Sequence, residues 1–112
     1  MEISERVDGS TAILTMTGRI DAISMAKVEQ AATGAIAGST NRLIMDMRGV
    51  DYISSAGLRA VLMAAKKAKA AGGGVALFGL QRDVEDVMTT SGFTTIVPIA
   101  STEAEARQLL GI

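Results

Sequence analysis

The sequence predicts an α/β fold in which a mixed sheet of four to five strands packs against about four helices. Three observations support this prediction. Short apolar runs typical of strands alternate with longer segments of helical periodicity. Asp8-Gly9 separates two short alternating runs, which is a hairpin signature. The 112 residues suffice for one hydrophobic core, so residues 1–112 are expected to form a single domain.

The first half of the chain predicts three strands and one helix. The expected strands cover residues 3–7, 11–17 and 43–47, and the helix covers residues 25–36. Residues 18–21 are expected to form a loop in which Asp21 caps the helix, and residues 49–51 a turn. Asp46 interrupts the third strand. We expect it at the exposed end of that strand or hydrogen-bonded to the following loop, in preference to a catalytic role.

The second half predicts three helices and two further strands. The expected strands cover residues 75–78 and 96–99, and the helices cover residues 58–68 and 83–90 and a segment that begins near residue 101. Their inward-facing residues are expected to be Leu58, Val61, Leu62, Ala65 and Ala68, then Val84, Val87 and Met88, then Ala106, Leu109 and Leu110. Pro98 predicts an edge strand because it has no backbone N–H. Thr102 and Glu105 have the spacing of a capping box.

The composition excludes several classes of function. Eleven basic and twelve acidic residues give a net charge of −1, and only three residues are aromatic, so no nucleic-acid partner is expected. The chain has no cysteine and no histidine, and we expect no metal or other cofactor. No apolar run approaches the roughly 20 residues of a membrane span, so no membrane partner is expected. A cytoplasmic location is the corresponding expectation.

Two adjacent hydroxyls, Ser54 and Ser55, lie where a strand is followed by a helix. The start of a helix presents unpaired N–H groups and a partial positive charge, which suit either a serine cap or a phosphate. From the residues alone, either serine could be the cap, and Ser55 could be a plain cap or a switch. A nucleophilic role would require a base, and both histidine and a Gly-x-Ser-x-Gly motif are absent. We therefore expect a binding module and no enzyme.

The chain resembles the STAS domains, and most closely the bacterial anti-sigma factor antagonists. The resemblance extends nearly from end to end and rests on four segments in the family's order: Thr17-Gly18-Arg19-Ile20-Asp21, Leu43-Ile44-Met45-Asp46-Met47, Ile53-Ser54-Ser55-Ala56-Gly57-Leu58 and Thr90-Ser91-Gly92-Phe93. The third segment is the most specific. The resemblance implies a STAS fold and a protein that binds an anti-sigma factor with serine kinase activity, thereby releasing a sigma factor.

In this family the kinase phosphorylates a serine at the start of the second helix, and a PP2C-type phosphatase removes the phosphate. By the motif, the phosphoacceptor corresponds to Ser55, and Asp21 corresponds to an acidic loop residue near it. Many members have aspartate before the phosphoacceptor and serine or threonine after it, whereas this chain has Ser54 and Ala56. The expected partner-binding residues are Asp21, Ser54, Ala56, Gly57, Arg59 and Met63.

The runner-up interpretation is a STAS domain without a phosphorylation cycle. Such a domain could be a constitutive scaffold or a soluble subunit of a transport complex, and it would bind through the same helix face. The near-neutral charge and the polar helix faces suggest a monomer.

Overall fold

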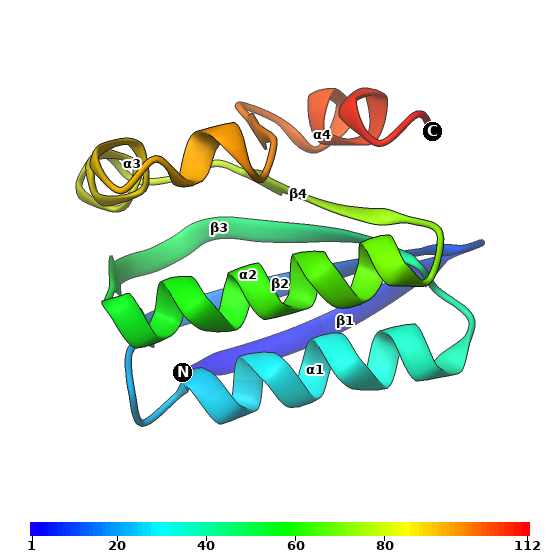
Figure 1. The fold of residues 1–112 in the computed structure, drawn as a ribbon, viewed down its shortest axis with the longest axis horizontal. Helices are drawn as coiled ribbons and strands as arrows, with labels where there is room; N and C mark the ends of the chain where they lie inside the picture. Colours follow the sequence, from blue (N-terminus) through cyan, green and yellow to red (C-terminus); the bar gives the residue numbers. More distant parts are fainter.

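The computed structural model describes all 112 residues and confirms the predicted order of strands and helices, with one added 3₁₀ helix, η1. The elements are β1 (Glu2–Asp8), β2 (Thr11–Ile20), α1 (Met25–Gly38), β3 (Arg42–Ile53), α2 (Ser55–Ala70), β4 (Gly74–Phe78), α3 (Arg82–Thr90), η1 (Phe93–Thr95), β5 (Ile99–Ala100) and α4 (Glu103–Leu109). Figure 1 shows α1 and α2 side by side along the sheet, with α3 and α4 beyond β4.

The five strands form one mixed sheet in the order β1-β2-β3-β4-β5. The predicted hairpin is confirmed: β1 pairs with β2 antiparallel around the Asp8-Gly9 turn. The pairs β2–β3, β3–β4 and β4–β5 are parallel. In the parallel part, the strands all end at the same edge of the sheet, the edge where α2 begins. Side chains after several strands are therefore brought together at this edge.

Alternation along β3 divides the core between the two faces of the sheet. Leu43 and Met45 lie in the larger buried cluster, together with residues of α1 and α2. Ile44 points to the opposite face, where a smaller cluster includes Ala106 of α4. The larger cluster is mainly aliphatic, with methionine and alanine where the helices lie against the sheet. The helices α1 and α2 form a layer on one face of the sheet, and α4 forms a partial layer on the other face. This is the α/β architecture that the sequence predicts.

The predicted turn at residues 49–51 is wrong, because β3 continues to Ile53. Val50 and Ile53 are buried, and pairing with β2 continues through Thr17↔Gly49 and Gly18↔Val50. The register between β2 and β3 shifts twice in this stretch, between Thr15 and Thr17 and between Gly18 and Arg19. At each shift β3 has one residue more than β2. The same pairing extends β2 to Ile20 and removes most of the predicted loop at 18–21. Gly49 therefore lies in an irregular strand and not in a turn.

Three predictions in the C-terminal part also need correction. The strand expected at 96–99 is only the two-residue β5, preceded by η1, although its position at the sheet edge is confirmed. Val87 is 40% exposed, because Val84 and Met88 alone form the buried pair of the short α3. Leu109 is 49% exposed, because the seven-residue α4 buries only Ala106.

The expected cap of α4 is confirmed: Thr102 Oγ1 accepts a hydrogen bond from the Glu105 backbone N–H at 3.2 Å. No helix in the structure combines the length and the apolar character that crossing a membrane requires.

Candidate functional site

The start of α2 is tied to the ends of two parallel strands. The Ser54 backbone N–H donates to the carbonyl oxygen of Ile20, the last residue of β2, at 2.9 Å. Ser54 has extended backbone angles, and its Oγ accepts a hydrogen bond from the Gly57 N–H at 3.2 Å. These features make Ser54 the N-cap of α2. The choice between the two serines that the sequence left open is therefore settled, since the cap is Ser54.

Gly57 allows the first turn of α2 to lie directly against the strand ends. A Cβ atom at this position would lie 2.5 Å from the Ile20 carbonyl oxygen and 2.9 Å from Cγ1 of Ile53. Real Cβ atoms do not approach backbone oxygen so closely, so only glycine fits without a shift of the helix. Gly57 is buried. It thus contributes to any partner surface only by fixing the position of the residues around it.

Ser55 is the first residue of α2 and is exposed to solvent. Arg59 and Met63 follow at spacings of four residues, so the three side chains lie along one exposed stripe of the helix. Met63 is 45% exposed. Ala56 is half-buried beside this stripe. Because Ser54 caps the helix, the hydroxyl of Ser55 is not needed for capping, and it lies at the positive end of the helix dipole.

The helix cap that we expected at Asp21 is wrong, because the residue directly before α1 is Ser24. Asp21 instead accepts hydrogen bonds within the turn that leads into α1. Asp21 Oδ1 accepts hydrogen bonds from the backbone N–H groups of Ile23 and Ser24, both at 3.0 Å. The Ser24 N–H bond is the main cause that holds the pKa of Asp21 below its usual value, and the Arg19 guanidinium at 3.7 Å adds to it. Asp21 is therefore a carboxylate at neutral pH, in the loop adjoining Ile20 and hence the start of α2.

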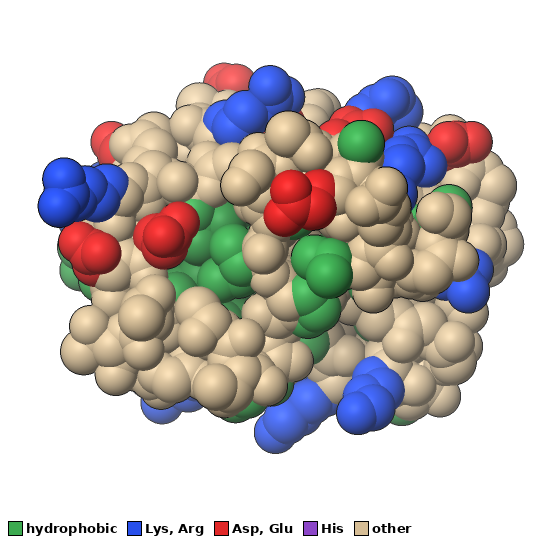
Figure 2. Space-filling view, turned by 90° about the horizontal axis from the view of Figure 1, so that it is seen from above, with side chains coloured by type: hydrophobic (Ala, Val, Ile, Leu, Met, Phe, Trp, Pro, Cys, Tyr) green, Lys and Arg blue, Asp and Glu red, His purple; other side chains and the backbone are tan.

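Sequence reasoning missed the residues that surround Ser55 in space. A shallow hollow of about 400 Å³ is lined by Ser55, Leu58, Arg59, Leu62, Ser91, Phe93 and Ile96. Ser91 follows α3, Phe93 lies in η1 and Ile96 follows η1. The Thr90-Ser91-Gly92-Phe93 segment gave a signal for the first two only. Figure 2, which looks onto the face formed by α3, η1 and α4, shows hydrophobic side chains exposed in hollows of this face. A second hollow is lined by Ser55 together with Asp86 and Thr90 of α3. The surface around Ser55 is therefore partly apolar and carries charges of both signs.

A second feature that the sequence did not reveal is a cation–π contact between neighbouring strands. The Arg19 guanidinium lies 4.0 Å from the centre of the Tyr52 ring, and these residues are paired in β2 and β3. Tyr52 is 41% exposed. This contact holds Arg19 at the sheet edge beside Asp21.

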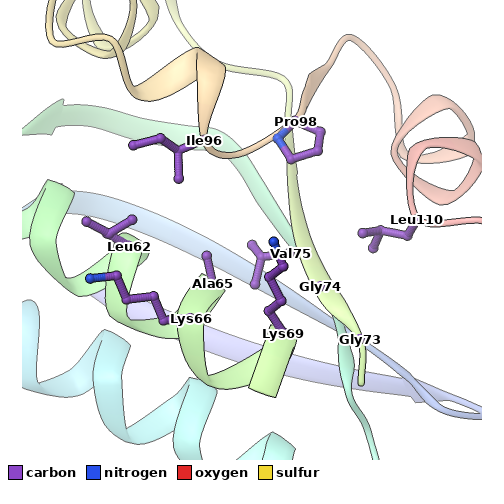
Figure 3. A pocket seen from close by; sticks show the side chains of 10 residues that line it. All are labelled: Leu62, Ala65, Lys66, Lys69, Gly73, Gly74, Val75, Ile96, Pro98 and Leu110. Atoms are coloured by element: carbon purple, nitrogen blue, oxygen red, sulfur yellow. The ribbon is translucent and has the colours of Figure 1, made fainter. Parts of the chain in front are cut away.

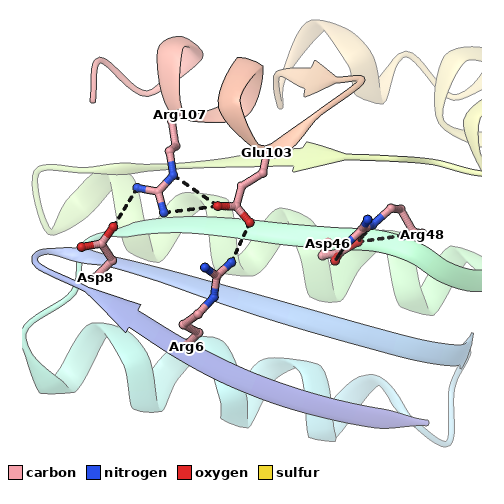
Figure 4. Close-up of polar contacts among 6 residues, drawn as sticks. All are labelled: Arg6, Asp8, Asp46, Arg48, Glu103 and Arg107. Atoms are coloured by element: carbon pink, nitrogen blue, oxygen red, sulfur yellow. Dashed lines mark hydrogen bonds and ion pairs between the residues drawn. The ribbon is translucent and has the colours of Figure 1, made fainter.

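Asp46 lies on the face of the sheet opposite to α2 and is 4% exposed. It forms a two-pronged ion pair with Arg48, with distances of 3.0 Å to Nε and 2.7 Å to Nη2 (Figure 4). Its Oδ1 also accepts the Arg48 backbone N–H at 3.1 Å. The exposed position that we expected is wrong, and the expected hydrogen bond is made to Arg48, which lies within β3 and not in a following loop. The Arg48 side chain covers the carboxylate.

Comparisons with known proteins agree with this architecture. The STAS domain family model matches residues 2–106. BtrV, a candidate anti-sigma factor antagonist of Bordetella bronchiseptica, is 31% identical over 102 residues, which cover 91% of this chain and 87% of BtrV. The chain therefore belongs to the STAS domain family.

Solved structures share the fold at lower identity. The anti-sigma factor antagonist SpoIIAA in its unphosphorylated form matches with a TM-score of 0.82 at 20% identity, covering 99% of this chain and 98% of that chain. An anti-sigma factor antagonist from Mycobacterium paratuberculosis matches with a TM-score of 0.87 at 18% identity, covering 99% and 94%. Phosphorylated SpoIIAA of Bacillus matches with a TM-score of 0.73 at 21% identity, covering 96% and 98%. The five-stranded mixed sheet with four helices is thus the STAS fold of these proteins.

Proposed function

We propose that this protein is an anti-sigma factor antagonist. It binds an anti-sigma factor that is also a serine kinase, and phosphorylation of Ser55 ends the interaction. The observation that carries the proposal is that the two adjacent serines have different structural roles. Ser54 caps α2, whereas Ser55 is exposed and does not serve as the cap. The relationship to BtrV and the existence of phosphorylated and unphosphorylated SpoIIAA structures support the same assignment.

A phosphate on Ser55 is compatible with the fold. It would add a charge of about −1.5 to −2 at an exposed position. The N-terminus of α2 favours such a charge by about 0.3–1 kcal/mol, and Arg59, one turn further along, is a second favourable group. The carboxylates of Asp86, which lines a hollow together with Ser55, and of Asp21 in the adjoining loop oppose it. All of these contributions are small against a domain stability of about 5–15 kcal/mol, so the modified protein stays folded.

A partner packed over Ser55 is affected much more strongly than the fold. An interface there would enclose the stripe of Ser55, Arg59 and Met63 together with the half-buried Ser54 and Ala56, while Asp21 lies in the adjoining loop. A dianion introduced into such an interface loses water without gaining a matched cation from the partner. Each 1.4 kcal/mol of this cost weakens binding about tenfold. Phosphorylation therefore changes the affinity for the partner and leaves the architecture intact.

The proposal includes a resetting enzyme. A PP2C-type phosphatase would remove the phosphate from the exposed Ser55 and restore binding. The protein itself acts in this scheme as a monomeric cytoplasmic binding module, and the kinase supplies the catalysis.

A pull-down with and without ATP, followed by mapping of the phosphorylated residue, tests the proposal. Without ATP, the tagged protein is expected to retain an anti-sigma factor kinase. With ATP, it is expected to carry one phosphate on Ser55 and to lose this partner. Ser55→Ala is expected to retain the partner in ATP, and Ser54→Ala, the matched control, is still expected to be phosphorylated on Ser55. A phosphate at another residue, or a partner that stays bound to the phosphorylated protein, would refute the proposal.

A second candidate function is that of a subunit in a transport complex, without a phosphorylation cycle. The observation in its favour is that the murine anion transporter Slc26a9 contains the same fold, with a TM-score of 0.76 at 17% identity over 95% of this chain and 18% of that chain. Neighbouring genes distinguish the two candidates. Genes for a serine kinase and a PP2C-type phosphatase favour the antagonist, whereas genes for transporter subunits favour the alternative.

A further inference from the structure

A hollow of about 350 Å³ lies between the second half of α2 and the C-terminal part of the chain. It adjoins the hollow beside Ser55, since Leu62 and Ile96 line both. Figure 3 shows that four parts of the molecule line it: the second half of α2, the start of β4, the segment between η1 and β5, and the residue after α4. The lining residues are Leu62, Ala65, Lys66, Lys69, Gly73, Gly74, Val75, Ile96, Pro98 and Leu110. Its volume lies within the range of small-molecule sites.

The walls of this hollow are largely apolar. Leu62, Ala65 and Val75 form one side, and Ile96 faces them from the opposite side (Figure 3). Gly74 opens β4 without a side chain, and a Cβ there would lie 3.4 Å from Cδ2 of Leu110, in ordinary contact. Ile96 is 59% exposed, so an apolar ligand would cover hydrophobic surface that is now in water.

The charged groups of the hollow all have the same sign. Lys66 and Lys69 contribute ammonium groups, and no aspartate or glutamate lines the hollow. Neither lysine belongs to any of the five ion pairs of the protein. Lys67, between them in sequence, points elsewhere and donates a hydrogen bond to Thr33 of α1 at 2.9 Å. Lys67 and Lys69 lie in the last turn of α2 and complement its C-terminal dipole, but only Lys66 and Lys69 flank the apolar walls.

We propose that this hollow binds a free amphiphilic monoanion, namely a medium-chain fatty carboxylate. The hydrocarbon chain would lie between Leu62 and Ile96, and the carboxylate would lie at the opening within reach of Lys66 and Lys69. The apolar walls account for the chain, and the pair of cations without a neighbouring acid accounts for the negative head group. The site needs neither the phosphorylation of Ser55 nor an anti-sigma factor, so it can be tested on the isolated protein.

Titration of the ¹⁵N-labelled protein with decanoate, below the concentration at which decanoate forms micelles, tests the proposal by NMR. Saturable shifts are expected at the amides of Leu62, Ala65, Val75, Ile96 and Leu110. Decyltrimethylammonium has a chain of similar length with a cationic head group, and it is expected to bind at least tenfold more weakly because Lys66 and Lys69 repel it. These shifts should remain unchanged when Ser55 is replaced by alanine, which separates this site from the proposed switch.

Charge reversal on α2 provides the matched variants. The double variant Lys66→Glu, Lys69→Glu is expected to weaken decanoate binding at least tenfold, because two favourable charges become unfavourable. Lys67→Glu is expected to leave the affinity within twofold of the original value. The proposal is overturned if decanoate causes no saturable shifts at the hollow, if it binds only above its micelle concentration, or if the cationic analogue binds equally well. It is also overturned if Lys67→Glu weakens binding as much as the double variant.

Discussion

The charged residues on α4 and those on α2 differ in one respect. Two of the three on α4, Glu103 and Arg107, form ion pairs, whereas none on α2 does. Glu103 of α4 contacts Arg6 of β1 at 2.6 Å and Arg107 at 3.3 Å. Arg107 also contacts Asp8 at 3.1 Å, so these four residues link α4 to the β1–β2 hairpin (Figure 4). No such network exists on α2.

All four cations on α2, Arg59, Lys66, Lys67 and Lys69, lie outside the five ion pairs of the protein, and only Lys67 has a side-chain hydrogen bond, to Thr33. In Figure 2, basic side chains along the lower edge of the view likewise lie apart from acidic ones. Paired charges serve to hold parts of the chain together, whereas unpaired charges beside apolar hollows remain available to partners and ligands. The comparison therefore predicts that changes near α4 and inside the sheet alter stability, and that changes on the exposed stripe of α2 alter binding.

The largest expected effect tests whether α2 is a fixed support for that stripe. Gly57→Ala is expected to lower the free energy of unfolding by about 3 kcal/mol, because the new Cβ would lie 2.5 Å from a backbone oxygen. Gly34→Ala in α1 is the matched control, since nothing lies within 4 Å of its Cβ position. It is expected to raise stability by about 0.5–1 kcal/mol. Urea unfolding measures both, and equal effects would show that the strand ends do not fix α2.

The next effect concerns the buried carboxylate of the sheet. Asp46→Asn is expected to cost about 2 kcal/mol at neutral pH, because charge-assisted bonds to Arg48 are lost. The Arg48 hydrogen bonds lower the pKa of Asp46 below 3.8, so its contribution is fully present above that pH and disappears as the pH falls through the folded value. The difference between variant and original protein should therefore be constant from pH 7 to about 5 and shrink below about 4. A difference that grows in acid would contradict this account.

A smaller expected effect on stability distinguishes the roles of the two serines at the start of α2. Ser54→Ala is expected to lower the free energy of unfolding by about 1 kcal/mol, because the Gly57 N–H loses its acceptor. Ser54→Asp should retain most of that stability, since aspartate caps helices as well as serine does. Thermal unfolding of both variants checks this. If Ser55→Ala cost as much as Ser54→Ala, the assignment of the cap to Ser54 would be wrong.

The smallest effect belongs to the paired network on α4. Arg107→Gln is expected to cost about 0.5 kcal/mol, because its pairs with Asp8 and Glu103 are partly exposed to water. The loss should decrease further as salt is added, since exposed ion pairs are screened. Urea unfolding at low and high ionic strength measures it. An effect on partner binding and none on stability would reverse the contrast drawn between α4 and α2.

Local patterns allowed the element order, the hairpin and the Thr102 cap to be predicted from the sequence. The path of β3 through Gly49 could not be predicted in this way, because pairing with β2 overrides the tendency of glycine to break strands. The hollow beside Ser55 was also out of reach, since Phe93 and Ile96 come near that residue only through the packing of the last third of the chain. The sequence alone could not decide which of the two adjacent serines caps the helix. That choice depends on the exact residue at which the helix begins, and a sequence gives such boundaries only to within a few residues.

The most direct test of the central claim measures affinity and stability together in Ser55→Asp, Ser55→Ala and the original protein. The partner is the anti-sigma factor kinase recovered by the pull-down. We predict that Ser55→Asp binds this kinase at least tenfold more weakly while its free energy of unfolding stays within about 0.5 kcal/mol, and that Ser55→Ala binds as the original protein does. Undiminished binding by Ser55→Asp, or a loss of binding accompanied by unfolding, would contradict the account.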